Sequence, residues 1–322
     1  MPAAALIAPT LDEIRAAANA LAPYVIRTPL IKLNDYEGPG EIFLKLENLQ
    51  PIGAFKARTL GYAMLTADAS KLEKGVYTAS SGNAGIGLAW MANKLGLAAT
   101  VYAPDSSPPA KLEVIRSFGA TVLLVDYEQW WQIIKTGNHP DSPGLFIDAV
   151  RSPAALAGNA TIGLEIAEQL PDVDTVFVPF GGGGIACGVS SAFRAINADT
   201  RIVAAESDAA APATAAFKAG RPVPVTMKPS FISGAGGLTV LEEMWPLISE
   251  LVDDTVVSPV SAVADAVRLL FEKNRVVVEG AGAISVAGAL AANSRAGKSV
   301  CVVSGGNIDP IVFSKILNRQ AV

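Results

Sequence analysis

The sequence predicts an α/β fold with two lobes, each built on an open, mostly parallel sheet flanked by helices. Short apolar runs alternate with helix-like stretches almost from end to end of the chain, which is typical of parallel sheets covered on both faces. The apolar runs are continuous, as in strands buried on both sides. The chain has 322 residues, half of them apolar, which is enough for two lobes.

The elements follow one another in a regular order. The expected strands are Gly75–Thr78, Ala99–Ala103, Thr121–Val125, Thr175–Phe180, Arg201–Ala205 and Ser299–Ser304. The expected helices are Asn83–Leu95, Pro109–Phe118, Thr161–Leu170, Ile185–Ile196, Ser261–Asn274 and Ala283–Ala292. A polar loop at 136–143 ends one run of strand–helix units, and another begins near Ala157. We therefore expect a small domain at 50–150 and a large domain made of 1–49 and 151–322.

Composition excludes several classes of protein. The formal charge of −5 is spread without a basic block, which argues against a nucleic-acid partner. Residues 1–9 are apolar but few and lack a basic leader, so we expect neither a signal peptide nor a membrane span, and a cytoplasmic location. Cys187 and Cys301 lie in apolar segments, as reduced buried thiols do. A single histidine, His139, excludes multi-histidine metal sites and disfavours a Ser-His-Asp triad.

A run of four glycines is the clearest chemical signal. Gly181, Gly182, Gly183 and Gly184 follow an expected strand and precede an expected helix. Glycine lets the backbone approach a ligand closely, and a helix start offers unpaired N–H groups. The alternative is a tight turn that binds nothing, but four glycines exceed what a turn needs. The run therefore predicts phosphate binding.

Three further turns carry polar groups at the ends of apolar segments. In Pro51–Lys56, the lysine is embedded among apolar residues, where desolvation would make its amine nucleophilic toward carbonyls. The turn Ser80–Gly85 offers hydroxyls, an amide and backbone N–H groups, and Val302–Asn307 is a strand running into a small polar turn. Each has a plainer interpretation: a surface lysine, a capped helix start and an ordinary strand–helix turn.

Together and in this order, these motifs resemble the pyridoxal-phosphate (PLP) enzymes of the tryptophan-synthase β group, fold type II. Within that group the chain resembles the serine/threonine dehydratase and serine racemase family. The likeness covers nearly the whole chain, including Lys45–Gln50 and Glu279–Ala283. The combination of motifs is highly specific, although each motif alone is not.

The resemblance implies a role for each motif around the cofactor. Lys56 would bond covalently to the cofactor aldehyde, with Phe55 packed against the ring. Asn83 would hydrogen-bond the phenolic oxygen, Gly181–Gly184 would hold the phosphate, and Ser304 would face the pyridine nitrogen. A neutral serine does not keep that nitrogen protonated, so the cofactor would be a weaker electron sink that favours loss of a β-substituent.

On the substrate side, Ser80, Ser81 and Gly82 would hold the carboxylate, and Lys56 would remove the Cα proton. The implied reaction is β-elimination by an ammonia-lyase, or dehydratase, that converts a β-hydroxy amino acid of the L-threonine or L-serine type to a 2-oxo acid and ammonia. Ser81 keeps an alternative open, because racemases of this family use a serine at this turn as a second acid–base group. The family also implies a homodimer.

Several loops depart from the family pattern and leave the preferred amino acid open. Ala84 replaces a usual histidine, and Asp148–Arg151, Asn159–Ala160 and Ser233–Gly237 replace other usual motifs. A bulkier or an acidic substrate is one consequence. Arg151 would then bind a second carboxylate of the substrate. The alternative is that Arg151 is a solvated loop arginine.

Some relatives in this family bind a divalent cation. Glu206 matches the expected glutamate and Ala210 offers a main-chain carbonyl, but Pro212 stands where an aspartate is expected. Oxygen-ligand sites need several anionic groups, so Mg²⁺ or Ca²⁺ here would lack one ligand unless Asp208 replaced it. Two rival functions also remain: a Rossmann-like nucleotide-binding enzyme, which lacks the dinucleotide spacing, and a non-catalytic protein that kept this fold.

Overall fold

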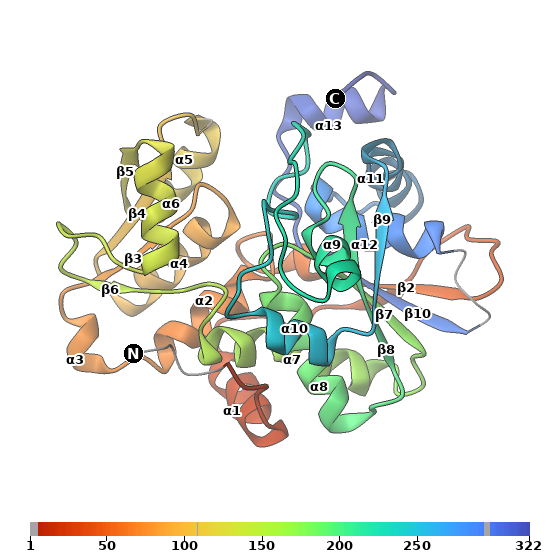
Figure 1. Cartoon of the computed structure of the whole chain (residues 1–322), viewed down its shortest axis with the longest axis horizontal. Helices are drawn as coiled ribbons and strands as arrows, with labels where there is room; N and C mark the ends of the chain where they lie inside the picture. Colours follow the sequence, from red (N-terminus) through yellow and green to blue (C-terminus); the bar gives the residue numbers. More distant parts are fainter. Residues whose placement is uncertain (1–5, 108, 293–296) are drawn as a thin grey trace.

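The structure is a computed structural model that describes residues 6–107, 109–292 and 297–322. The start of the chain, where we expect no leader peptide, lies partly outside these residues. Two separate sheets lie side by side (Figure 1), with the smaller one on the left of that view and the larger one on the right. The predicted α/β class, with mostly parallel sheets flanked by helices, is confirmed.

The larger sheet has six strands in the order β1-β2-β10-β7-β8-β9. Only the β1–β2 pair is antiparallel within it. Its strands are β1 (Leu30–Lys32), β2 (Glu41–Lys45), β7 (Thr175–Pro179), β8 (Arg201–Ser207), β9 (Asp254–Ser258) and β10 (Lys298–Val302).

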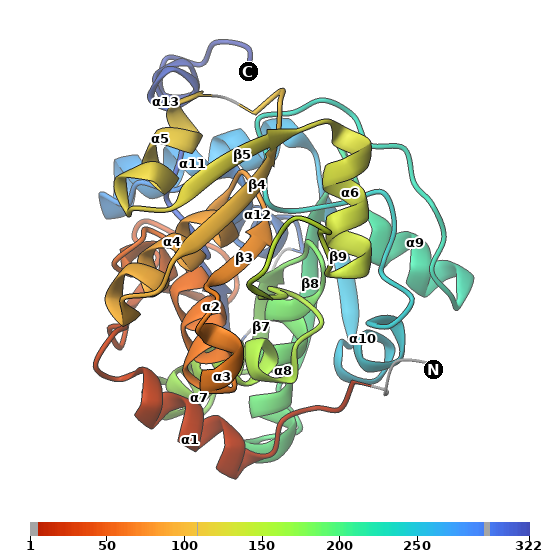
Figure 2. The same cartoon turned by 90° about the vertical axis from the view of Figure 1, so that its left-hand side faces the viewer.

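The smaller sheet has four parallel strands in the order β5-β4-β3-β6. They are β3 (Val76–Ala79), β4 (Ala99–Pro104), β5 (Thr121–Val125) and β6 (Leu145–Phe146). Figure 2 looks onto this sheet and shows β5 at its edge.

Helices cover both sheets. They are α1 (Leu11–Leu21), η1 (Glu47–Leu49, a 3₁₀ turn), α2 (Lys56–Leu65), α3 (Ala69–Leu72), α4 (Asn83–Leu95), α5 (Pro109–Ser117), α6 (Tyr127–Thr136), α7 (Pro153–Gln169), α8 (Gly184–Ile196), α9 (Pro212–Ala219), α10 (Trp245–Leu251), α11 (Val260–Asn274), α12 (Gly280–Ala291) and α13 (Pro310–Leu317). No helix of the described part is long and apolar enough to cross a membrane.

Two helices illustrate how the interior of the molecule is packed. Helix α12 is made almost entirely of Gly, Ala and other small residues, which lets it lie close against the strands of the larger sheet. Helix α7 is buried over most of its surface because it packs against α1, α2 and α8. Helix α7 also connects the regions of the two sheets. It packs against α2, and α2 packs in turn against α4, which covers the smaller sheet.

The six predicted strands are present, with ends that match within two residues. Strands β1, β2, β6 and β9 were not predicted. Helix α7 begins at Pro153, well before the predicted Thr161, because the Ser152 side chain accepts a hydrogen bond from the backbone N–H of Ala155 and caps an earlier start. The prediction that the strands are buried on both faces is wrong for β5, because β5 is an edge strand whose Leu124 is 51% exposed.

Candidate active site

A cavity of about 400 Å³ collects most of the residues that the sequence singled out. It lies at the carboxyl ends of β3 and β10, where parallel sheets place ligands. The predicted site residues that line it are Phe55, Lys56, Ser80, Ser81, Gly82, Asn83, Gly182 and Ser304. A larger hollow of about 690 Å³ lies at the opposite, amino ends of β7 to β10 and contains none of these residues.

Lys56 is the first residue of α2, and its amine is enclosed in this cavity. Its Nζ donates to the carbonyl oxygen of Ala149 at 3.1 Å and lies 4.7 Å from the centre of the Phe55 ring. Burial lowers the pKa of Lys56 to about 8, although the nearby Asp148 carboxylate opposes the shift. Roughly a tenth of the amine is therefore uncharged at pH 7 and about half at pH 8, and this fraction is available as a nucleophile or base.

The turn that carries Ser304 holds the lysine turn in place. The backbone N–H of Phe55 donates to the carbonyl of Ser304 at 2.9 Å, and the N–H of Gly306 donates to the carbonyl of Gly53 at 2.8 Å. Asn307 adds a side-chain bond of 2.9 Å to the carbonyl of Ile52. Gly53 has a positive φ of 71°, and a Cβ there would lie 2.6 Å from the Asn307 side chain. Two turns far apart in sequence thus form one rigid wall.

Asn83 joins this wall to a buried carboxyl group. Its side-chain nitrogen donates to Glu279 Oε1 at 2.6 Å, and its oxygen accepts from Asn307 Nδ2 at 2.8 Å. Burial raises the pKa of Glu279 to about 7, while the Asn83 hydrogen bond and the Lys111 ammonium act in the other direction. Asn83 is therefore held in one orientation by two partners at the floor of the cavity.

The four glycines form the turn between β7 and α8. Gly183 has a positive φ of 87°, and Gly184 is the first residue of α8. A Cβ on Gly182 would lie 2.9 Å from the Val150 side chain, and one on Gly181 would lie 2.9 Å from the carbonyl oxygen of Gly234. Of the four, only Gly182 is among the residues lining the cavity. This close packing requires that Gly181 and Gly182 have no side chains. The first N–H groups of α8 have no partner within the helix, so they are available to bind an anion.

The turn predicted to hold the substrate carboxylate faces the same cavity. It follows β3 and leads into α4, whose N-cap is Gly82. The backbone N–H of Gly82 donates to Ser80 Oγ at 3.1 Å, and Ser81 lines the cavity together with Lys56. Hydroxyls, N–H groups and the start of α4 are thus concentrated at one wall, which suits an anion.

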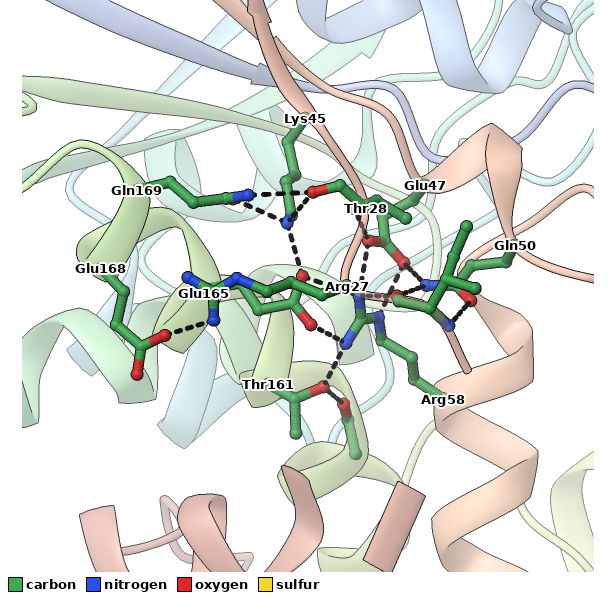
Figure 3. A network of polar contacts seen from close by, with 12 residues as sticks. Arg27, Thr28, Lys45, Glu47, Gln50, Arg58, Thr161, Glu165, Glu168 and Gln169 are labelled. Carbon is green, nitrogen blue, oxygen red and sulfur yellow. Dashed lines mark hydrogen bonds and ion pairs between the residues drawn. The ribbon is translucent and has the colours of Figure 1, made fainter. Parts of the chain in front are cut away.

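A buried ionic network fixes α2 behind the cavity (Figure 3). Arg58 is 1% exposed and pairs with Glu47 at 2.8 Å and with Glu165 at 2.7 Å. Lys45 approaches Glu165 from the other side and donates to the carbonyl of Thr28 at 2.9 Å. Because Arg58 is two residues from Lys56, this network anchors the helix that presents the amine.

Of the two predicted metal-ligand residues, Glu206 and Ala210, the first has other hydrogen-bond partners. Glu206 accepts hydrogen bonds from the backbone N–H groups of Ala213 and Thr214 at 2.8 Å and from the Thr214 hydroxyl at 2.6 Å, so it caps α9. Neither Glu206 nor Ala210 lines the cavity. Within the described ranges, no group of three or more His, Cys, Asp or Glu side chains could hold a metal ion.

Arg151 lines the cavity, but its N–H groups are engaged. Nε donates to Asp148 Oδ2 at 2.8 Å, and the terminal nitrogens donate to the carbonyls of Ile134 and Lys135. It also lies 3.7 Å from Glu243. Arg151 is thus held by neighbouring groups of the protein and is not a solvated arginine. The geometry does not support a role for Arg151 in binding a substrate carboxylate.

Sequence reasoning missed several residues of the site. Glu279 was noted only as part of a family-like stretch, and neither its burial nor its bond to Asn83 is visible from local pattern. Lys111, which donates to Ser233 Oγ at 3.1 Å, and Trp130 also line the cavity. Asn307 was quoted within a turn without a role. None of these residues has a local signal of its own, because each acquires its place through contacts with distant segments.

Comparison with known proteins identifies this arrangement. A profile described as "Pyridoxal-phosphate dependent enzyme" matches residues 21–305. The chain belongs to the pyridoxal-phosphate-dependent enzymes. Its residues fit the cofactor: a buried amine with a lowered pKa, a glycine turn that side chains would block, and the 4% exposed hydroxyl of Ser304 at the cavity wall. These features match an aldehyde, a phosphate and a ring nitrogen respectively.

Relatives narrow the family to the serine/threonine dehydratases and serine racemases of fold type II. The chain is 37% identical to L-threonine ammonia-lyase of Geobacter sulfurreducens over 320 residues, which is 96% of this chain and 78% of that protein. It is 31% identical to serine racemase of Oryza sativa subsp. indica over 96% of this chain and 94% of that protein. The structure of maize serine racemase superposes with a TM-score of 0.89 at 31% identity, covering 97% of this chain and 98% of that one. The resemblance drawn from the sequence is confirmed.

Proposed function

We propose that this chain is a PLP-dependent ammonia-lyase that converts a β-hydroxy amino acid of the L-threonine or L-serine type to a 2-oxo acid and ammonia by β-elimination. The observation that carries the proposal is the convergence of Lys56, Asn83, Ser304 and the glycine turn on one cavity that also contains the Ser80–Gly82 turn. The similarity to an L-threonine ammonia-lyase over nearly the whole chain supports the same reaction class.

Four sets of residues would hold the cofactor. Lys56 would carry it covalently with Phe55 beside the ring, Asn83 would donate to its phenolic oxygen, the turn Gly181–Gly184 would bind its phosphate, and Ser304 would meet its ring nitrogen. When bound, the cofactor supplies an electron sink for the substrate's Cα. The Glu279 carboxyl lies behind Asn83 and would fix the direction of the Asn83 amide.

The remaining steps follow from the chain's own groups. The N–H groups and hydroxyls of Ser80, Ser81 and Gly82 would bind the substrate carboxylate and orient the Cα–H bond toward Lys56. The Lys56 amine, with a pKa of about 8, then accepts the Cα proton. The C–O bond at Cβ breaks, and the hydroxyl leaves with a proton as water. The released enamine adds water to give the 2-oxo acid and ammonia.

The test is an assay of 2-oxo acid release from L-threonine and L-serine by the PLP-loaded protein. We expect turnover that Lys56→Ala abolishes, whereas Lys94→Ala, a lysine in the last turn of α4, leaves it unchanged. A protein that binds PLP yet releases no 2-oxo acid from any β-hydroxy amino acid would refute the proposal.

Serine racemisation is the second candidate, alone or beside elimination. It is favoured by the presence of Ser81, a hydroxyl that lines the cavity together with Lys56, and by similarity to serine racemases. Two acid–base groups in one cavity are what proton removal and return on two faces of Cα require. Measuring D-serine and pyruvate from L-serine, with Ser81→Ala beside the unmodified enzyme, separates the two activities. Loss of D-serine with retained pyruvate in the variant would assign the racemase role.

We extend the proposal to organisation and assembly. Residues 50–150 would form a small domain against a large domain of 1–49 and 151–322, in a cytoplasmic homodimer with no nucleic-acid or membrane partner. The homodimer rests on the family resemblance. Light scattering of the purified protein measures the assembly.

A divalent cation, Mg²⁺ or Ca²⁺, at Glu206 and Ala210 stays a prediction with less support. The carboxylate of Glu206 already caps α9, and burial raises its pKa, although the Thr214 hydrogen bonds oppose this. Both features lower its availability as an anionic ligand. Calorimetric titration of the chelator-treated protein with either ion measures whether the site exists.

A further inference from the structure

We infer that the side-chain end of the cavity selects β-hydroxy amino acids that carry a large apolar group on Cβ, with an aryl ring as the best match. This inference rests on the proposed β-elimination and names its substrate class. It is carried by five apolar side chains that line the cavity, Trp130, Ile134, Phe146, Val150 and Leu241, called here the apolar wall.

The apolar wall brings together parts of the chain that are distant in sequence. Trp130 and Ile134 are four residues apart on α6, so they lie on the same side of that helix. They pack with Phe146 of β6 against a buried cluster in the smaller part of the molecule. Val150 lies over the glycine turn, and Leu241 comes from the chain between α9 and α10. The same cavity contains Lys56, so a substrate bound there can extend its Cβ group toward this wall.

Two charged groups of the cavity, Asp148 and Arg151, are paired with each other. Asp148 accepts from the backbone N–H groups of Val150 and Arg151 and from Arg151 Nε, at 2.8 to 2.9 Å. Arg151 also donates to two carbonyls of α6. An acidic side chain on the substrate would have to displace these partners to bind Arg151, whereas an apolar one would bury surface against the wall.

Aromatic rings in the apolar wall favour an aryl group. Trp130 and Phe146 both line the cavity, and aromatic pairs gain energy beyond the area that they bury. An aryl group on Cβ would fill the apolar space beside these rings. A methyl group, as in threonine, or a hydrogen, as in serine, would leave that space unfilled.

The reaction needs no additional reagent. For L-threo-3-phenylserine, the Cα–H and Cβ–O bonds break and water leaves. The enamine then takes up water and releases ammonia, giving phenylpyruvate with no net oxidation. L-phenylalanine has the same ring but no β-hydroxyl, so it reports binding at the apolar wall without turnover.

The experiment measures both turnover and binding in the PLP-loaded enzyme. We expect kcat/KM for L-threo-3-phenylserine to exceed that for L-threonine by roughly tenfold or more, the range that a filled apolar pocket gives. By calorimetry, L-phenylalanine should bind at least about tenfold more tightly than L-alanine. Trp130→Ala should remove both preferences, measured as the ratio of kcat/KM for L-threo-3-phenylserine over L-threonine and the ratio of affinities for L-phenylalanine over L-alanine. Trp131→Ala is the matched control, because Trp131 is the adjacent tryptophan of α6 but does not line the cavity.

The outcomes separate the subsite from the reaction. Turnover of L-serine and L-threonine, with no preference for phenylserine and no tighter binding of L-phenylalanine, would overturn the inference and leave the proposed function intact. If no substrate yields a 2-oxo acid but L-phenylalanine still binds more tightly in a Trp130-dependent way, the proposed reaction fails and the subsite stands. Retention of the preference for phenylserine in Trp130→Phe, together with its loss in Trp130→Ala, would support the role of an aromatic ring at this position.

Discussion

At the scale of single residues, burial shifts two ionisable groups toward neutral pH. The pKa of Lys56 falls to about 8 and that of Glu279 rises to about 7, in both cases because burial disfavours the charged form. Perturbed groups of this kind gather at functional sites. Both Lys56 and Glu279 line the cavity, and Glu279 also accepts a hydrogen bond from the Asn83 amide.

The protein without cofactor should capture PLP at Lys56 with a rate that rises as pH increases through about 8, because only the uncharged amine attacks the aldehyde. Borohydride trapping followed by peptide mass spectrometry measures the capture. Lys56→Arg should show none, while Lys111→Ala, which removes another lysine of the same cavity, should retain it. Stoichiometric labelling of the Lys56→Arg variant would contradict the assignment.

The raised pKa of Glu279 predicts a specific dependence of stability on pH. The folded state holds a proton on this carboxyl that the unfolded state loses near pH 4.5, so the free energy of unfolding should fall as pH rises from about 4.5 through about 7 and level off above. Since each unit of pKa shift is worth about 1.4 kcal/mol, the change is on the order of 3 kcal/mol. Urea unfolding across this range measures it.

Glu279→Gln should flatten that profile, because a neutral amide replaces the titrating carboxyl and its oxygen can still accept from Asn83. The control is Glu243→Gln, whose side chain is 47% exposed. Identical pH profiles for the unmodified protein and Glu279→Gln would show that another group is responsible.

At the scale of elements, the site is made of turns that begin helices. Helices α2, α4 and α8 start at Lys56, Asn83 and Gly184, so each contributes its first turn to the same region. The first N–H groups of a helix have no partner within it, which makes these starts suitable for binding anions. The order of strand, turn and helix along the chain therefore determines where phosphate and carboxylate are held.

Gly182→Ala should weaken PLP binding. The added Cβ would lie 2.9 Å from the Val150 side chain, so either Val150 or the glycine turn must move. We expect the dissociation constant for PLP to rise about tenfold, which corresponds to about 1.4 kcal/mol. Equilibrium titration by PLP absorbance measures it.

Gly237→Ala is the matched control for that measurement, since its added Cβ would meet nothing closer than the carbonyl of Thr239 at 3.8 Å. An unchanged dissociation constant in Gly182→Ala would contradict the role of the turn as a close phosphate cradle.

At the scale of the whole molecule, the buried network of Figure 3 connects segments that carry different parts of the site. Arg58 of α2 pairs with Glu47, the first residue of η1, and with Glu165 of α7. Both carboxylates are buried or nearly so, and Glu165 is shared between Arg58 and Lys45. The network thus fixes α2, and with it Lys56, against the larger sheet and α7.

Arg58→Met should destabilise the fold by about 3–5 kcal/mol, because it leaves the buried Glu47 carboxylate without its ion-pair partner and Glu165 with Lys45 alone. Arg27→Met is the matched control: Arg27 pairs with Glu168, but both side chains are about half exposed, so the cost should be about 0–1 kcal/mol. Chemical denaturation of the two variants compares them. Equal stability of the two would mean that the buried network contributes no more than a surface pair.

Prediction from sequence succeeded where interactions are local. The strand–turn–helix pattern around Gly181–Gly184 and the start of α4 at Asn83 follow from residue order, and both are found as predicted. It failed where tertiary contacts override local pattern. The apolar segment 121–125 became an exposed edge strand, because no further strand covers it in the sheet order. The role of Arg151 was left undecided for the same reason, since two of its hydrogen-bond acceptors are carbonyls of α6.

The sequence by itself determined the fold class, the family and the order of the chemical groups along the chain, since periodicity and turn chemistry depend on neighbouring residues. Only the tertiary structure decided which groups meet. Asn83 contacts Glu279 and Asn307, nearly two hundred residues or more away, and the apolar wall joins α6, β6 and the chain before α10. Such contacts are set by packing of the whole molecule, so the partner of a carboxyl group and the shape of a substrate pocket become visible only in the folded chain.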